Sequence, residues 1–118
     1  MFNPKKILVA TDFTDASDSA LREAADIARR FNSQVHLLHV IEDIRQCAVD
    51  YCLSEAEIAA ENNKLREEAG RKMNEEIDRA VSSKSFPLFS EVLFGNAVDA
   101  IIGYERDNNI DLRNDRQA

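Results

Sequence analysis

Polar residues that could take part in chemistry gather directly after the first apolar run of the chain, at Thr11 and Asp12. The run itself, residues 7–10, is bounded by lysines on one side and by small polar residues on the other, which is typical of a strand buried on both faces of a parallel sheet. In open α/β sheets, ligands bind in the crevice beyond the carboxyl ends of the strands. We therefore expect Ala10, Thr11 and Asp12 to lie at a ligand-binding crevice. A second interpretation of Asp12 stays open, in which its carboxylate caps a helix or stabilises the loop.

The two histidines and the two cysteines do not form a recognisable catalytic or metal-binding set. His36 and His39 are separated by an odd number of residues, so on a strand they point to opposite faces and cannot bind one metal ion together. Each is predicted to be a half-buried packing residue with a backbone or water partner. Cys47 and Cys52 lack the further ligands that a zinc site needs and are predicted to be ordinary thiols in a reducing compartment. Because no Ser-His-Asp or Cys-His arrangement, HExxH motif or P-loop is recognisable, we predict no catalytic residue and no metal, and an enzymatic activity is not expected beyond the weak ATP hydrolysis that stays open.

The net charge of the chain and the lengths of its apolar segments limit the kinds of partner that we expect. The 118 residues include 22 acidic and 15 basic side chains, and the resulting net charge of −7 repels a phosphate backbone, so nucleic acid is not expected as a partner. The apolar run near the N-terminus is too short for a signal peptide or a membrane span, and no segment has the basic, aromatic-edged face of a membrane-surface helix. We therefore expect a cytoplasmic protein without a membrane partner, with residues 1–118 in a single domain.

Strands and helices are predicted to alternate along the chain. A Ser-x-x-Glu capping box begins at Ser54, and Gly95-Asn96 combines a tight turn with a helix N-cap. The loop at residues 42–53 is expected to lie near the crevice. The predicted elements are a strand at 7–10, a helix capped within 14–19 and extending to 31, a strand at 35–41, a helix at 54–81, a strand at 88–94, a helix at 97–107 and the opening of a fourth strand at 110–112.

The predicted core follows from the faces that these elements must bury together. Its members are Val9, Leu37, Leu38, Val92 and Ile101. The strands at 7–10 and 35–40 are expected to be parallel neighbours, while the alternating pattern of 88–94 indicates an edge strand with one less buried face. Residues 113–118, which are polar except for Ala118, are predicted to form a tail.

The order of elements resembles the universal stress protein family over residues 5–112. The features that carry the resemblance are the acid-bearing first strand that ends in Ala10-Thr11-Asp12, Ser19-Ala20-Leu21 in the first helix, His39-Val40 at the end of the second strand, and Gly95 before a helix. The resemblance implies an α/β fold, a three-layer, doubly wound parallel sheet of the adenine nucleotide alpha hydrolase-like class. It also implies that the first strand lies between the second and the fourth, and that the protein is a homodimer.

The resemblance also implies a nucleotide site, because some members of the family bind ATP and others do not. In binding members, the counterparts of Ala10, Thr11 and Asp12 lie against the nucleoside and the backbone of Val40 meets the adenine, and Gly95 is expected to frame the same crevice. The glycine segment that holds the phosphates in those members has no counterpart after Leu112. We therefore expect a partial site at which ATP binds weakly, if it binds, with weak ATP hydrolysis left open.

The fifth strand of the family, which commonly joins two subunits, has no counterpart either, so the chain is expected to lack the usual last strands. The first strand would then be an edge of bare backbone groups, which favours self-association. Three classes of function stay open: a stress-response regulator with a partial adenine-nucleotide site, a non-nucleotide dimerisation or interaction module on the same scaffold, and an enzyme, for which the residues offer the least support.

Overall fold

The computed structural model describes residues 2–42, 54–82 and 85–114. Within them, strands and helices alternate as the sequence predicts. The elements are β1 (Lys6–Ala10), α1 (Asp15–Phe31), β2 (Gln34–Ile41), α2 (Glu55–Ala80), β3 (Leu88–Phe94), α3 (Ala97–Asp107) and β4 (Leu112–Arg113). The prediction of ordinary thiols at Cys47 and Cys52 lies outside the described residues.

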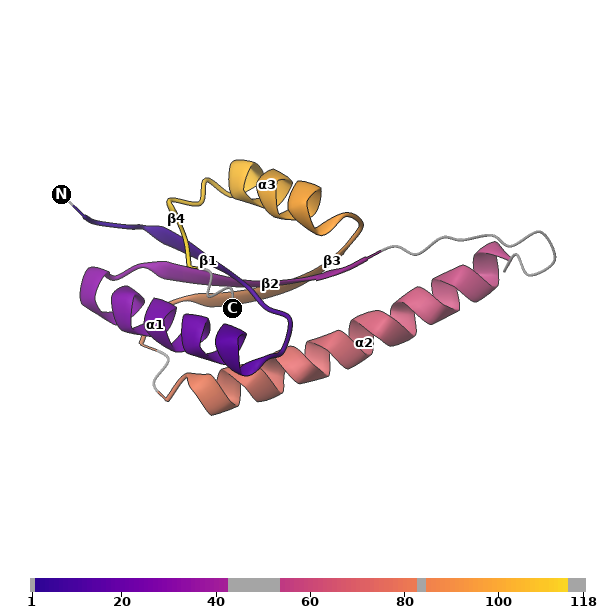
Figure 1. The fold of residues 1–118 in the computed structure, drawn as a ribbon, viewed down its shortest axis with the longest axis horizontal. Helices are drawn as coiled ribbons and strands as arrows, with labels where there is room; N and C mark the ends of the chain where they lie inside the picture. The colour runs from indigo at the N-terminus through magenta and orange to yellow at the C-terminus, as the bar shows by residue number, and fades with distance from the viewer. Residues whose placement is uncertain (1, 43–53, 83–84, 115–118) are drawn as a thin grey trace.

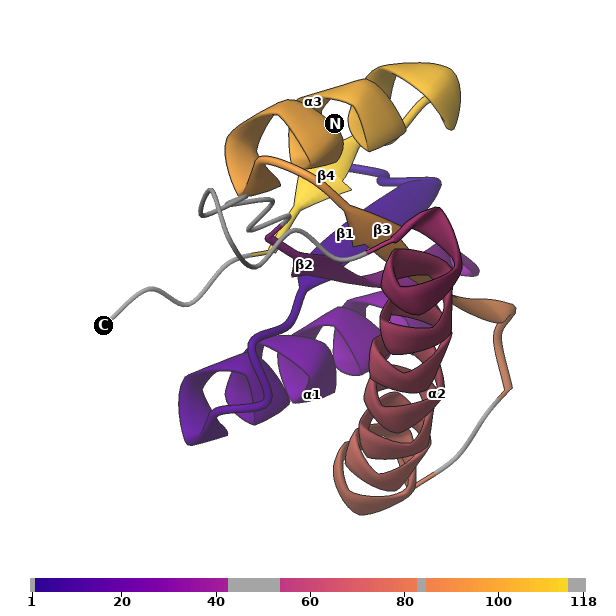
Figure 2. The same ribbon diagram turned by 90° about the vertical axis from the view of Figure 1, so that its right-hand side faces the viewer.

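The four strands form one parallel sheet in the order β3-β2-β1-β4. Val9 of β1 lies opposite Leu37 of β2, so the predicted pairing of the first two strands is confirmed. The prediction that β3 is an edge strand is also confirmed. Helices α1 and α2 cover one face of the sheet and α3 covers the other, which gives the three layers of a doubly wound fold (Figures 1 and 2).

The core has two parts, one on each face of the sheet. The larger lies under α1 and α2 and contains Val9 and Leu37, whereas the smaller joins Leu8 and Leu38 to Tyr104 of α3. The predicted burial of Val9, Leu37 and Leu38 is confirmed, since each is at most 1% exposed. The prediction is met only in part for Val92 and Ile101, which are partly buried and pack against the larger and the smaller core, respectively. Val92 belongs to the edge strand, and Ile101 also lines a cleft, so each side chain keeps part of its surface open.

Helix α2 is much longer than the sheet that it covers. Its N-terminal half projects past the sheet, so its apolar residues Ile58 and Leu65 are only partly buried (Figure 1). The capping box at Ser54 forms as predicted, with the Glu57 N–H donating to Ser54 Oγ and the Ser54 N–H donating to Glu57 Oε1, both at 3.2 Å. The C-terminal half alone therefore contributes to the core, through Ala69, Met73, Glu76, Ile77 and Ala80.

Strand β4 corrects two predictions about the end of the chain. It pairs with Ile7 and Leu8, so β1 is an inner strand there and not the bare edge that the sequence suggested. The reason is an anchor just before β4, where Asp111 Oδ2 accepts hydrogen bonds from the backbone N–H groups of Lys5 and Lys6, at 2.8 and 2.9 Å. The polar tail also does not begin at Arg113, which is part of β4.

Candidate functional site

The turn from β1 into α1 is held by hydrogen bonds among its own polar side chains. Phe13 has a φ of 65°, a left-handed conformation that is uncommon for a residue other than glycine. Thr11 Oγ1 accepts a hydrogen bond from the Phe13 N–H at 3.0 Å and donates one to Ser17 Oγ at 2.9 Å. Thr14 is the N-cap of α1, as the polar residues at 14–19 predicted. The turn is therefore a fixed platform at the carboxyl end of β1.

Asp12 is an exposed residue of this platform. Its Oδ1 accepts a hydrogen bond from the Thr14 N–H at 3.2 Å and another from the Thr14 hydroxyl. The hydrogen bond from the Thr14 hydroxyl is the main cause that lowers the pKa of Asp12 below its usual value. The loop-stabilising interpretation of Asp12 is thus observed, and it occupies one of the two carboxylate oxygens.

A cleft of about 720 Å³ opens beyond the carboxyl ends of β1 and β2 and is bounded on its other side by α3 and β4. Four of the five residues predicted for the site line it: Ala10, Thr11, Asp12 and Val40. The opposite wall is apolar and includes Val98 and Ile102 of α3, which are 63% and 50% exposed.

The fifth predicted site residue, Gly95, is not among the residues that line the cleft. It lies in the turn between β3 and α3, where its φ of 133° favours glycine and its N–H donates to the carbonyl of Ile41 at 3.0 Å. The next residue, Asn96, caps α3 by accepting from the Asp99 N–H at 3.1 Å. Gly95 therefore directs the chain into the helix that forms the cleft wall.

The two histidines lie on opposite faces of the sheet, as predicted. His39 lines the cleft, with Nδ1 2.8 Å from the backbone oxygen of Thr11 and its ring 4.4 Å from that of Phe13, so the predicted backbone partner is confirmed. His36 is buried under α3, with Nδ1 2.7 Å from the Tyr104 hydroxyl and Nε2 3.2 Å from the side-chain oxygen of Gln34. For His36 the prediction of a backbone or water partner was wrong, because α3 places a tyrosine over it. Burial is the main cause that lowers the pKa of His36.

Arg113 is a cleft residue that sequence reasoning assigned to a polar tail. Its guanidinium forms a forked ion pair with Glu105 of α3, in which Nε lies 2.9 Å from Oε2 and a terminal nitrogen contacts Oε1. This pair is the main cause that lowers the pKa of Glu105. The alternation of side chains along a strand could have placed Arg113. Leu112 packs on the larger core, so the side chain of the next residue faces the opposite layer.

A buried polar network lies behind the cleft and was also missed. Glu76 of α2 is completely buried, and its Oε2 accepts a hydrogen bond from Ser17 Oγ at 3.0 Å. Its other oxygen, Oε1, has no hydrogen-bond partner. Asp18 beside it receives two hydrogen bonds from Arg79, at 2.8 and 3.0 Å. Glu76 falls three residues after Met73, within the apolar stripe of α2, and that spacing was the available signal.

The two carboxyl groups of this network have pKa values shifted in opposite directions. Burial is the main cause that raises the pKa of Glu76 to about 7, and the neighbouring Asp18 adds to the rise. The hydrogen bonds from Arg79 lower the pKa of Asp18 to about 2. Glu76 is therefore largely neutral below neutral pH, and Asp18 is ionised.

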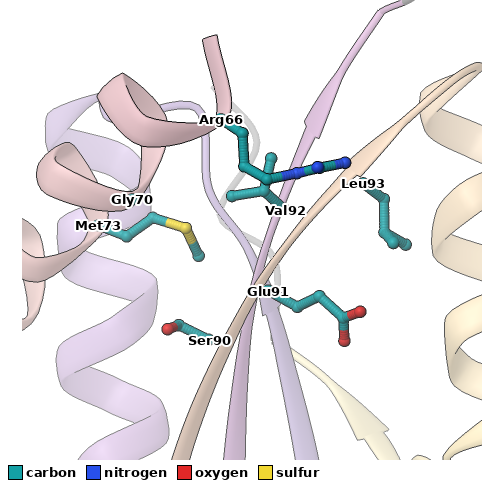
Figure 3. Close-up of a pocket in the computed structure, with 7 residues that line it drawn as sticks. All are labelled: Arg66, Gly70, Met73, Ser90, Glu91, Val92 and Leu93. Atoms are coloured by element: carbon teal, nitrogen blue, oxygen red, sulfur yellow. The ribbon is translucent and has the colours of Figure 1, made fainter. Parts of the chain in front are cut away.

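A second hollow, of about 500 Å³, lies between α2 and the edge strand β3 (Figure 3). Met73 and Ser90 lie on its α2 side, while Glu91 and Leu93 point to the other side of the strand. Arg66 lies over the ring of Phe94, 4.9 Å from its centroid. None of the residues predicted for the site lines this hollow. In the described part of the chain, no three His, Cys, Asp or Glu residues are grouped so that they could hold a metal ion.

The parallel sheet, the helices on both of its faces and the cleft beyond its central strands define a domain of the adenine nucleotide alpha hydrolase-like fold class. The chain belongs to the universal stress protein family, whose family model matches residues 3–112. The resemblance seen in the sequence is thereby confirmed. Since the structure describes the chain only as far as Asn114, the absence of the glycine segment stays a prediction.

Several solved structures are similar to this one. The universal stress protein UspA from Lactobacillus plantarum is 22% identical with a TM-score of 0.77, over 96% of this chain and 77% of that chain. The hypothetical protein MJ0577 is 26% identical with a TM-score of 0.70, over 94% and 73%. A universal stress protein solved in complex with cAMP is 20% identical with a TM-score of 0.64, over 95% and 71%. No curated protein matches the chain in sequence. Among the described residues, no helix has the length and apolar composition needed to cross a membrane.

Proposed function

We propose that this protein is a cytoplasmic stress-response regulator that binds an adenine nucleoside or nucleotide in the cleft. The observation that carries the proposal is that Ala10, Thr11, Asp12 and Val40, the residues expected to meet a nucleoside, line one cleft. The cleft lies where ligands bind in open α/β sheets. A similar protein of the same family has been solved in complex with cAMP, which supports an adenine ligand.

The two walls of the cleft suit the two parts of a nucleoside. The apolar side chains of Val98 and Ile102 offer a surface for the flat face of the base, and the backbone of Val40 lies opposite for its polar edge. Asp12 uses Oδ1 to hold Thr14, and in this proposal Oδ2 accepts hydrogen bonds from ribose hydroxyls. The two interpretations of Asp12 are therefore compatible.

We propose binding and not catalysis as the role of the cleft. His39 Nδ1 is within hydrogen-bond distance of the Thr11 carbonyl, and Asp12 Oδ1 is held by Thr14, so the ionisable side chains of the platform are engaged in fixing the turn. The hydroxyl of Ser17, a residue of the cleft lining, is engaged in hydrogen bonds with Thr11, Thr14 and Glu76, and Glu76 itself is completely buried. ATP is expected to bind weakly.

Calorimetry with adenosine, and with guanosine as the control ligand, tests the proposal. Asp12→Asn should weaken adenosine binding about tenfold, because a hydrogen bond to a charged group contributes about 1.5–3 kcal/mol. Asp15→Asn is the matched control, since it removes one acidic charge from the first turn of α1 and is not part of the cleft lining. The proposal is refuted if neither adenosine nor an adenine nucleotide gives binding heat at millimolar concentration, or if guanosine binds as tightly as adenosine.

A second candidate function is a homodimerisation or interaction module. The observation that favours it is the outer edge of β3, a seven-residue strand whose only partner in the sheet of the described chain is β2. An edge of this kind is a template for pairing with another strand. Sedimentation equilibrium tests self-association directly, and a strict monomer at high micromolar concentration would contradict the homodimer.

A further inference from the structure

The charge of the cleft lining is divided between two elements. Asp12 brings a carboxylate on the β1 side, and Arg113 brings a guanidinium on the β4 side. Among the described residues that line the cleft, Arg113 is the one arginine or lysine. A cation in a cleft proposed for a nucleoside has an evident ligand, because the fork of a guanidinium matches the oxygens of a phosphate group.

We propose that Arg113 binds the phosphate of a nucleotide in this cleft, so that the site prefers a nucleoside monophosphate to the nucleoside. The inference rests on the proposed function, since it assigns the phosphate-facing side of the same site. It adds to the expectation drawn from the sequence, which found no counterpart of the phosphate-holding glycine segment and predicted that ATP binds weakly.

The backbone of Arg113 is fixed on both sides. Arg113 pairs with Leu8 of β1, two residues before the cleft residue Ala10. After it, the backbone N–H of Asn114 donates to the carbonyl of Leu8 at 2.9 Å, and the Asn114 side chain donates to the carbonyl of Ala20 at 2.7 Å. The guanidinium therefore projects from an anchored position and not from the end of a loose tail.

Glu105 orients the side chain and also competes for it. The carboxylate of Glu105 accepts hydrogen bonds from Nε and from one terminal nitrogen of the guanidinium. The Arg113 side chain is 40% exposed and that of Glu105 is 24% exposed, so solvent and ligand reach the pair. A phosphate shares the fork with Glu105, and the carboxylate weakens this contact by repulsion between like charges.

The preference is for one phosphate and not for three. A second or third phosphate gains no further lysine or arginine in the described lining, and it adds negative charge to a chain whose net charge is −7. Adenosine monophosphate (AMP) is therefore expected to bind about tenfold more tightly than adenosine, with no comparable gain from AMP to ATP.

Calorimetry at low ionic strength with adenosine, AMP and ATP tests the inference in four proteins. In the wild type, the ratio of AMP affinity to adenosine affinity should be about ten. Arg113→Gln should reduce that ratio to about one, and Glu105→Gln should raise it several-fold by removing the competing carboxylate. Asp107→Asn, which removes an exposed acidic charge from the same helix, should leave the ratio at its wild-type value.

The outcomes separate this inference from the proposed function. A ratio near one in the wild type, or a ratio that Arg113→Gln does not change, overturns the role of Arg113 while nucleoside binding stands. Absence of binding by adenosine and AMP overturns both. If AMP binds and adenosine does not, and Arg113→Gln abolishes AMP binding, the role of Arg113 is supported and nucleoside recognition is refuted. Circular dichroism of each variant verifies the fold, and Glu105→Gln gives an independent answer should Arg113→Gln not fold.

Discussion

Glu76→Gln is expected to make the protein more stable at alkaline pH and to remove much of its pH dependence. The carboxyl of Glu76 is completely buried, and one of its oxygens has no hydrogen-bond partner. Ionisation puts an unpaired charge into that environment beside the ionised Asp18, which is why the pKa of Glu76 is raised from 4.5 to about 7. A glutamine has the same shape without the ionisation.

The sign and size of this pH dependence of stability follow from the linkage between protonation and folding. Because the pKa of Glu76 is higher in the folded state, its contribution to stability is complete below pH 4.5 and is lost as the pH rises through 7. With about 1.36 kcal/mol for each pH unit between the two pKa values, the free energy of unfolding should fall by about 2 to 3 kcal/mol between pH 5 and pH 8 through this group alone.

Urea unfolding of the wild type and Glu76→Gln at pH 5 and pH 8 measures the effect. His36 contributes with the opposite sign, because its lowered pKa makes the folded state more stable as the pH rises, but this contribution is common to both proteins and cancels in the comparison. Glu75→Gln is the matched control, since the adjacent Glu75 is exposed. If the wild type and Glu76→Gln lose the same free energy between the two pH values, the assignment of a neutral, buried carboxyl at Glu76 is wrong.

Two further predictions concern elements that frame the site. Asp111→Ala should destabilise the pairing of β4 with β1 by about 1–2 kcal/mol, because it removes two backbone-to-carboxylate hydrogen bonds at an exposed site. Hydrogen exchange of the Asn114 amide should therefore accelerate. The control Asp107→Ala should leave that exchange at the wild-type rate. Ser54→Ala should destabilise the N-terminus of α2 by about 1 kcal/mol, and the effect should be mostly local fraying, because that end projects past the sheet. We expect faster amide hydrogen exchange in the first turns of α2 and an almost constant global free energy of unfolding. Ser82→Ala is the control.

The fold was accessible from the sequence because its main signals are local. The apolar run before Thr11 and the capping residues Thr14 and Ser54 each act within a few residues, and all of them formed the predicted structure. The burial of individual side chains was less predictable because it depends on which other elements pack against them. Val92 has the sequence pattern of a core residue, but its strand has a neighbour on one side only within the described sheet.

The residues of the candidate site were likewise predictable from the sequence only where their signals are local. Thr11 and Asp12 were found because they follow a buried strand directly, and the rule for ligand crevices refers to that position. Glu76 was hidden because a single glutamate in a charged helix resembles its solvated neighbours, and only its position between Met73 and Ala80 distinguishes it. Its partner Ser17 is 59 residues away, so no local pattern connects the two.

Arg113 shows how contacts between distant residues can reverse a conclusion about charge. From the sequence, the crevice contained a carboxylate at Asp12 with no basic neighbour, which argues against a phosphate. In the folded chain, the pairing of β4 with β1 brings a guanidinium to the same cleft from more than ninety residues along the chain. The sign of the electrostatic potential there therefore depends on how strongly Glu105 screens Arg113.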